Sequence, residues 1–124
     1  NESQHWGIYY SLQITMNFKE KCYQILKRVP KGKVTTYKAI ANSLNSKAYR
    51  AVGTAMKKNI SKKVPCHRVI NSDGKIGQYN LGVSKKIQLL KSEGIMVENN
   101  KVDLNKYEFK FGTTNNLKYN GFNI

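Results

Sequence analysis

The chain of 124 residues is poor in cysteine, histidine and acidic residues, and it has no long apolar run. Its two cysteines, Cys22 and Cys66, are too few for a disulfide framework and neither belongs to a CxxC pair, so we expect both thiols to be free. The two histidines, His5 and His67, do not complete a zinc site, and we expect neither a metal nor another cofactor. No apolar run approaches the ~20 residues of a membrane span, and the N-terminus lacks the pattern of a signal peptide. These absences argue against a disulfide scaffold, a zinc module and a membrane protein.

The overall composition of the chain is that of one folded domain. Hydrophobic residues make up 40% and charged residues 23% of the chain, which is ordinary for a globular protein. A chain of this length can bury roughly two-thirds of its unfolded surface in its own core. We expect the domain over residues 17–111, preceded by a short extension over residues 1–16 and followed by a loose, Asn-rich tail over residues 112–124. The extension is a native strand over residues 8–15, the remnant of a missing domain, or residues added to the native sequence.

The scarcity of acid leaves a large excess of positive charge. Lys and Arg number 22 against 7 Asp and Glu, which gives a net charge of +15. Most of the excess lies within residues 17–66, where thirteen basic residues accompany one acidic residue. Apolar residues interrupt these cations at helical spacing, so the segment belongs to the fold and is not a basic tail. An excess of this size favours a polyanionic partner, and nucleic acid is the one we expect.

Capping residues and apolar periodicity predict a helix at the start of the domain. Asn17 is expected to cap a helix over residues 17–28 whose inner face includes Cys22. Pro30 and Gly32 end it. On this interpretation Cys22 is a core residue and not a reactive thiol.

Two shorter helices follow in the pattern of a helix-turn-helix. Thr35 or Thr36 can cap the first helix, and Ser46 can cap the second, over residues 47–58. The inward residues are Ile40, Ala41 and Leu44 in the first and Val52, Ala55 and Met56 in the second. Two short helices joined by a tight polar turn predict a helix-turn-helix.

The second half of the chain predicts short β segments around one more helix. Residues 67–71 are β-like, and a helix over residues 83–93 ends at Gly94. Residues 95–111 predict two short strands joined by a turn at residues 99–100. The expected fold class is therefore mostly α with short β elements, organised around the helix-turn-helix.

The second helix of that pair has small side chains on one face and basic side chains around them. Small side chains at Ala51 and Gly53 allow a close approach to a nucleic-acid groove. Basic side chains that can neutralise phosphates surround them, at Lys47, Arg50, Lys57 and Lys58. The alternative is an ordinary surface helix with solvated lysines.

The sharpest chemical feature is the run Pro65-Cys66-His67-Arg68-Val69. A cysteine beside a histidine is typical of an activated thiolate, because a nearby base or cation lowers the pKa of the thiol. Adjacent side chains of an extended segment point apart, so a water would have to bridge Cys66 and His67. Glu93, at the end of its helix, can orient His67, raise its basicity and complete a Cys-His-Glu relay. The alternative is a buried cysteine beside a structural histidine.

Several of these motifs occur in the order found in one known family. They are Arg50-Ala51-Val52-Gly53, Asn59, Pro65 to Ile70, Ser72-Asp73-Gly74, Gly77, Tyr79, Gly82, and Leu89-Leu90 with Glu93-Gly94. In this combination the chain resembles the O6-alkylguanine-DNA alkyltransferases over roughly residues 17–96. The resemblance implies the C-terminal catalytic domain of such a protein, a winged-helix-like helix-turn-helix fold that includes a reactive Cys66.

The reaction that the resemblance implies is a single-turnover repair. The protein would flip an O6-alkylguanine, or an O4-alkylthymine, out of duplex DNA and move the alkyl group to Cys66. His67 would act as a base through a water, and Glu93 would orient it. Arg50 would fill the vacated place in the duplex while the second helix lies in the minor groove. The remaining implied roles belong to Tyr37 in base rotation and proton donation, Asn59 in bracing the active-site segment, and Val69, Tyr79, Asn80 and Gly82 in the alkyl and guanine pocket.

The resemblance also implies partners, and it leaves alternatives. It implies a monomer that binds double-stranded DNA containing O6-alkylguanine and does not associate with a membrane. Such a protein would work in the cytoplasm or nucleoid of a prokaryote, or in the nucleus of a eukaryote. The chain departs from the family pattern at Tyr49, Ile60 and Asn80, where a small residue, proline and serine are usual. One alternative is a non-catalytic lesion sensor of the same fold, although such relatives replace the reactive cysteine with tryptophan and this chain retains Cys66. Others are a helix-turn-helix DNA-binding regulator and, more distantly, a cysteine hydrolase.

Overall fold

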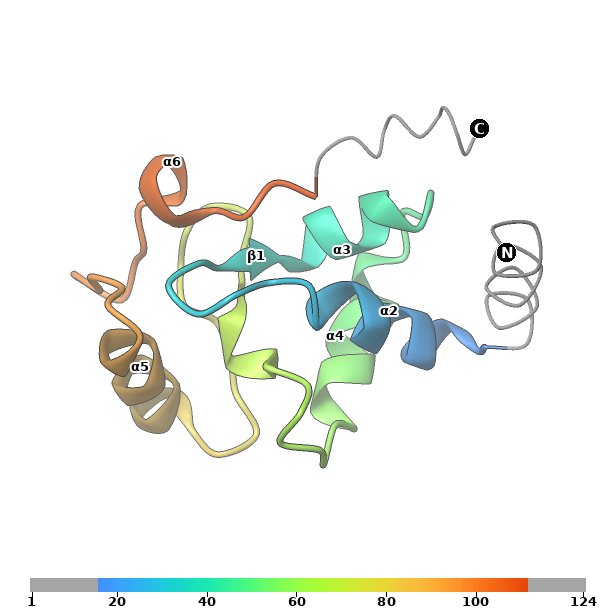
Figure 1. The fold of residues 1–124 in the computed structure, drawn as a ribbon, viewed down its shortest axis with the longest axis horizontal. Helices are drawn as coiled ribbons and strands as arrows, with labels where there is room; N and C mark the ends of the chain where they lie inside the picture. The colour runs from blue at the N-terminus through green and yellow to red at the C-terminus, as the bar shows by residue number, and fades with distance from the viewer. Residues whose placement is uncertain (1–15, 112–124) are drawn as a thin grey trace, which may run out of the picture.

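The computed structural model describes residues 16–111 (Figure 1). The strand expected over residues 8–15 and the tail expected over residues 112–124 lie outside the described residues. In chain order the described elements are α2 (Phe18–Leu26), β1 (Thr35–Thr36), α3 (Tyr37–Ser43), α4 (Tyr49–Lys57), the 3₁₀ helix η1 (Cys66–Arg68), β2 (Val69–Ile70), α5 (Val83–Ser92) and α6 (Leu104–Tyr107). Regular structure is mostly helical and each strand has only two residues, which confirms the expected fold class.

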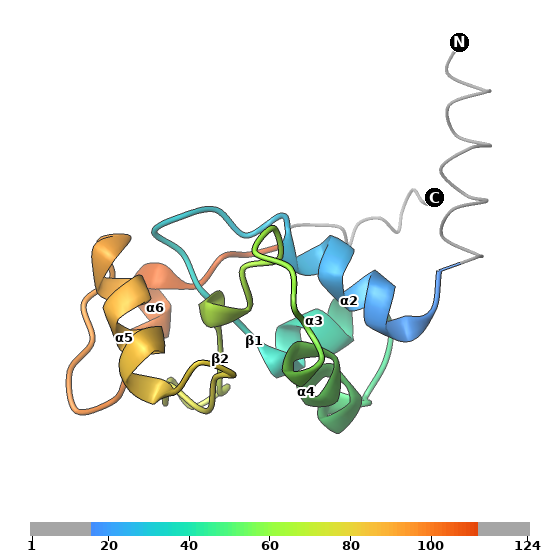
Figure 2. The same ribbon diagram turned by 90° about the horizontal axis from the view of Figure 1, so that it is seen from below.

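The helices form two groups on either side of a two-stranded parallel sheet (Figures 1 and 2). α2, α3 and α4 pack against one another on one side, and α5 and α6 lie on the other. In the sheet, Thr35 lies opposite Val69 and Thr36 lies opposite Ile70. Successive residues of a strand point to opposite faces, so Val69 enters the core of the first group and Ile70 enters the core of the second. The short sheet thereby joins two separate cores.

The larger core lies among the first three helices. Its buried residues are Cys22, Leu26, Val29, Ile40, Ala41, Val52, Ala55, Met56, Val64 and Val69. The smaller core consists of Val34, Ile70, Ile76, Leu90, Ile95 and Val102. Cys22 is fully buried, as predicted, and burial raises the pKa of its thiol to about 11. This thiol is therefore protonated, and unreactive as a nucleophile, at neutral pH.

The first helix begins at the predicted cap. The Asn17 side chain accepts a hydrogen bond from the Glu20 N–H at 2.8 Å, and the Glu20 carboxylate accepts one from the Asn17 N–H at 3.0 Å. The helix ends at Leu26, two residues earlier than expected. Its last turn tightens, because the N–H groups of Arg28 and Val29 bond to carbonyls three residues back.

The helix-turn-helix is present, with one correction at its turn. Thr36 caps α3, because its hydroxyl accepts the Ala39 N–H at 3.0 Å. Ser46 does not cap a helix that starts at residue 47. Its hydroxyl accepts the Ala48 N–H at 2.9 Å in a local turn, and α4 begins only at Tyr49.

The segment predicted as β-like over residues 67–71 starts instead as a 3₁₀ turn. The Arg68 N–H bonds to the Pro65 carbonyl at 2.9 Å, and extended backbone begins only at Val69. The expectation that adjacent side chains in an extended segment point apart therefore does not apply to Cys66 and His67.

The prediction of two strands over residues 95–111 is half wrong. Asn99 and Asn100 do form a tight turn, with φ values of 53° and 59° that asparagine tolerates, and Glu98 pairs with Lys101 across it. Beyond the turn, α6 replaces the second strand. Its cap is Asp103, whose carboxylate accepts the Asn105 N–H at 3.0 Å.

The two threonines of β1 provide a matched test of the fold. Thr36 accepts the capping hydrogen bond of α3, whereas the buried hydroxyl of Thr35 has no hydrogen-bond partner within residues 16–111. Thr36→Val should lower the free energy of unfolding by about 1 kcal/mol through loss of the cap. Thr35→Val should leave it unchanged or raise it, because it removes an unpaired buried polar group at nearly constant volume. Urea unfolding of both variants measures this, and equal losses would contradict the capping account.

Candidate functional site

A cleft of about 1120 Å³ lies between the helix-turn-helix and the loop that follows β2. Its lining residues from the helix-turn-helix are Tyr37, Lys38, Tyr49, Arg50, Gly53, Met56 and Lys57, and Cys66 lines it from η1. Those from the loop are Asn71, Ser72, Asp73, Gly77, Gln78, Tyr79 and Asn80. The cleft thus brings Cys66 together with three tyrosines and with basic side chains of α4, although these residues are far apart in the sequence.

Cys66 is held by the loop that precedes it. The side-chain amide of Asn59 donates to the sulfur of Cys66 at 3.3 Å and to the carbonyl of Val64 at 3.1 Å. The amide oxygen of Asn59 accepts the Ser61 N–H at 3.0 Å, so one buried side chain ties both ends of the loop. The amide therefore fixes the position of the sulfur at the start of the 3₁₀ helix η1.

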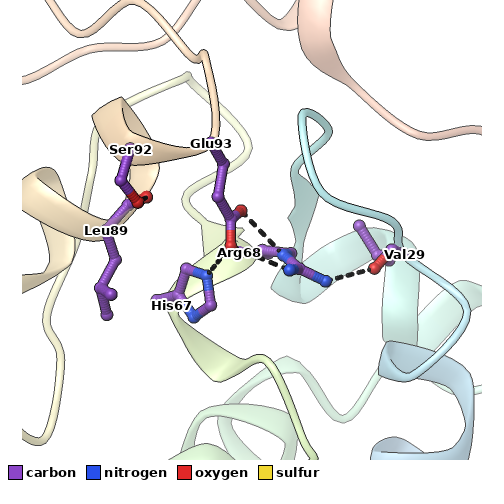
Figure 3. A network of polar contacts seen from close by, with 6 residues as sticks. All are labelled: Val29, His67, Arg68, Leu89, Ser92 and Glu93. Carbon is purple, nitrogen blue, oxygen red and sulfur yellow. Dashed lines mark hydrogen bonds and ion pairs between the residues drawn. The ribbon is translucent and has the colours of Figure 1, made fainter.

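His67 points toward the end of α5, where Glu93 is the C-cap residue (Figure 3). Its Nε2 lies 2.8 Å from Oε2 of Glu93. Arg68 donates to the same carboxylate twice, at 2.9 Å from Nε and 2.8 Å from Nη2, and its Nη1 donates to the carbonyl of Val29 at 2.7 Å (Figure 3). One carboxylate therefore orients both side chains that follow Cys66.

The protonation states of this network follow from burial and its hydrogen bonds. Burial alone would raise the pKa of Glu93, but the hydrogen bonds from Arg68 and His67 outweigh it and lower that pKa. Burial lowers the pKa of His67 and outweighs the opposing effect of Glu93, so the expected increase in basicity is not the net result. At neutral pH the imidazole is uncharged and donates from Nε2 to an ionised Glu93. Its Nδ1 is then left as a proton acceptor.

Lys86 is a buried cation beside the cleft that no motif in the sequence indicates. Its ammonium group donates to the carbonyls of Ile76 at 2.6 Å and Gln78 at 2.9 Å, which belong to the loop lining the cleft. Burial lowers its pKa to about 8, while negative charge on Cys66 raises it, so Lys86 and a thiolate at Cys66 attract each other. The signal in the sequence is its position four residues before the buried Leu90, on the inner face of α5.

Two of the three tyrosines that line the cleft have a raised pKa, Tyr37 and Tyr79. Tyr37 is the first residue of α3, and Tyr79 lies edge-on to His67 with ring centroids 6.4 Å apart. Burial is the main cause that raises the pKa of both phenols, and the negative charge of Cys66 adds to it. Both hydroxyl groups therefore keep their protons at neutral pH and can donate them.

The other residues selected from the sequence divide between the cleft and its surroundings. Asn80 lines the cleft, and its side-chain amide donates to the carbonyls of Met56 and Asn59, both at 3.2 Å. Val69 lies fully buried in the larger core, and Gly82 is the exposed N-cap of α5, so neither lines the cleft. Of the DNA-contact candidates, Arg50, Gly53 and Lys57 line it, whereas Lys47, Ala51 and Lys58 are exposed outside it.

No group of three or more metal-binding side chains occurs within residues 16–111. None of the helices described there is long and apolar enough to cross a bilayer.

Comparison with known proteins gives consistent matches. Residues 17–95 match the family model described as 6-O-methylguanine DNA methyltransferase, DNA binding domain. A bifunctional methyltransferase/endonuclease of Picrophilus torridus is 42% identical over 89 residues, which are 70% of this chain and 30% of that protein. A methylated-DNA–protein-cysteine methyltransferase of Candida glabrata is 37% identical over 101 residues, 80% of this chain and 49% of that protein. The chain thus spans less than half the length of these two relatives.

Among solved structures, S. pombe Atl1 in complex with damaged DNA containing O6-carboxymethylguanine is similar to this chain with a TM-score of 0.68 and 33% identity. The match covers 75% of this chain and 94% of that one. The similarity therefore extends over nearly the whole of a short relative.

The Glu93 network predicts a large effect of Arg68 on stability. Arg68→Met leaves the half-buried Glu93 with His67 alone, so the free energy of unfolding should fall by about 2–3 kcal/mol and the pKa of Glu93 should rise. The control is Lys75→Met, which removes an ion pair to Asp73 at 4.0 Å between side chains that are 62% and 58% exposed. That variant should lose less than about 1 kcal/mol. Urea unfolding at neutral pH compares them, and similar losses would refute a structural role for the network.

Proposed function

The chain belongs to the 6-O-methylguanine DNA methyltransferase family, whose DNA binding domain it matches over residues 17–95, and from this we propose that it repairs DNA by accepting an alkyl group on Cys66. The substrate is O6-alkylguanine in duplex DNA. The observation that supports the transfer best is the position of Cys66, which lies in the cleft with the Asn59 amide directed at its sulfur. Residues 17–111 would form the unit that both binds DNA and reacts.

The transfer is a displacement at the alkyl carbon. The thiol proton of Cys66 passes through a water to Nδ1 of His67, which Glu93 holds in the required tautomer. The sulfur then forms a bond to the alkyl carbon while the bond from that carbon to O6 breaks, and the electron pair of the broken bond stays on guanine. Tyr37 donates a proton to the departing guanine. The thioether on Cys66 is stable, so each chain reacts once.

Reaction requires that the base leave the duplex, because the alkyl carbon is not open to in-line attack inside the stack. We propose that α4 enters the minor groove, where Ala51 and Gly53 leave room for close approach. Arg50, exposed at the start of α4, would occupy the place of the flipped nucleotide. Tyr79 and Asn80 would border the pocket that receives it, whereas Val69 would act only from the core beneath.

A second candidate is a lesion sensor that binds the same base without accepting its alkyl group. It is favoured by the match to S. pombe Atl1, which covers 94% of that chain and whose structure contains DNA with O6-carboxymethylguanine. Both candidates predict binding to alkylated duplex. Only the first predicts a covalent product on this chain.

The two cysteines separate these candidates. Cys66→Ser should abolish transfer of labelled methyl groups from O6-methylguanine duplex while binding to the duplex stays within about twofold, because Cys66 acts after the base is extruded. Cys22→Ser should still transfer the label, since the thiol of Cys22 is buried and protonated. Label that remains on the Cys66→Ser protein would show that the nucleophile is assigned wrongly.

The rate of transfer should depend on pH through His67. The base must be uncharged, and burial lowers the pKa of His67 below its ordinary value of 6.5. The single-turnover rate should therefore be constant from pH 7.5 to about 6.5 and fall only as the pH drops through the lowered pKa. Glu93→Gln removes an interaction that raises this pKa, so the decline should begin at a still lower pH. A decline that begins above pH 6.5 in the wild-type protein would contradict this role.

Binding to duplex should depend on salt through α4. Each phosphate neutralised contributes about 0.9 to the slope of log affinity against log salt, so Lys57→Gln with Lys58→Gln should lower the slope by up to ~2. Lys91→Gln with Lys101→Gln, on the other side of the molecule, is the matched control and should leave the slope unchanged. Titrations of undamaged duplex at several salt concentrations measure both. Equal slopes in the wild-type protein and in both double variants would show that Lys57 and Lys58 do not contact DNA phosphates.

A further inference from the structure

Tyr49 is an exposed aromatic side chain at the start of α4, beside Arg50. It is 38% exposed and lines the cleft. The other large hydrophobic side chains exposed within residues 16–111 are Ile60, Leu81, Val83 and Met96. None of these four lines the cleft, so Tyr49 is the one whose apolar surface faces the site.

The fold does not account for this aromatic ring. Tyr49 belongs to neither core and is not among the side chains packed against them. Its hydroxyl has no hydrogen-bond partner in the described part of the chain, whereas the hydroxyl of Tyr23 donates to the carbonyl of Ala55 at 2.7 Å. An aromatic ring that lines a cleft without packing against either core is free to contact a ligand, and tyrosine supplies both an apolar face and a polar hydroxyl for this.

The surroundings of Tyr49 indicate what it contacts. Gly53 lies one turn further along the same face of α4, and a Cβ atom placed there would meet nothing within 4 Å. The ring therefore stands beside open space at the helix surface. Lys38, Arg50 and Lys57 line the same cleft, which gives it a net positive charge against the single carboxylate of Asp73. Cations with an accessible aromatic ring are the combination that binds phosphates and stacks on bases.

We propose that Tyr49 stacks on the nucleobase that borders the extruded nucleotide and so stabilises the opened duplex. This inference rests on the proposed function, because it needs α4 in the groove and a base outside the stack. Arg50 and Tyr49 then act together. The guanidinium occupies the vacated place, and the ring covers the base face that extrusion has exposed. Tyr49 is a positioning residue and does not touch the reacting atoms.

The test uses a duplex with one abasic site, which exposes a base face without requiring extrusion. Tyr49→Ala should bind this duplex about 5- to 100-fold more weakly than the wild-type protein. Tyr49→Phe retains the ring and should bind as the wild-type protein does. Met96→Ala, which shortens an exposed side chain outside the cleft, is the matched control and should also be unchanged.

Two further readouts distinguish stacking from other effects. The slope of log affinity against log salt should be the same for Tyr49→Ala and the wild-type protein, because the ring neutralises no phosphate. The loss on an intact duplex should be smaller than on the abasic duplex. Thermal unfolding of Tyr49→Ala close to that of Met96→Ala confirms that both variants are folded.

The inference is overturned if Tyr49→Ala binds the abasic duplex as tightly as the wild-type protein, if Tyr49→Phe loses as much as Tyr49→Ala, or if the loss is equal on both duplexes. Failure of the proposed function would look different. In that case the wild-type protein itself would bind neither duplex, or would bind O6-methylguanine duplex without accepting a methyl group.

Discussion

The ionised carboxylate of Glu93 is the interaction on which the arrangement of the site depends. It accepts hydrogen bonds from His67 and, twice, from Arg68, and Arg68 in turn donates to the carbonyl of Val29 (Figure 3). The end of α5, the 3₁₀ turn and the chain beyond α2 are thereby tied to one point. Because every donor in this network has a partner, the buried charge is compensated and the geometry of the turn is held firmly. Cys66 begins that turn, so the direction of its sulfur depends on the same network.

The division of the molecule into two cores explains how the cleft is built. Val69 and Ile70 point to opposite sides of β2, which couples the helix-turn-helix to the part of the chain that includes α5. Two amides connect these parts beside the cleft, since Asn59 donates to the sulfur of Cys66 and Asn80 donates to the carbonyl of Met56 in α4. The basic surface of α4, which we propose contacts DNA, and the sulfur of Cys66 therefore lie at one cleft between the two connected parts.

Local rules predicted much of this fold. Asn17 and Thr36 cap helices as expected, because their side-chain oxygens accept free N–H groups of the first helical turn. Tertiary contacts decided the rest. The 3₁₀ turn at Cys66 and the early end of α2 depend on backbone hydrogen bonds that leave no periodicity in the sequence. Lys86 was missed because lysine is rarely buried, and only the two carbonyls of the loop make its burial tolerable. The pairing of His67 with Glu93 was anticipated, but Arg68 as the second donor was not, and the catalytic roles remain predictions.

The central claim is that Cys66 accepts an alkyl group once and keeps it. Intact-mass spectrometry after incubation with duplex containing O6-methylguanine tests this most directly, followed by peptide mapping of the product. The account predicts that each chain gains the mass of one methyl group in exchange for a proton, that the peptide containing Cys66 bears it, and that further substrate adds nothing. An unchanged mass in a protein that is bound to the duplex would contradict the claim and favour a lesion sensor, and a methyl group on the peptide containing Cys22 would contradict the assignment of the nucleophile.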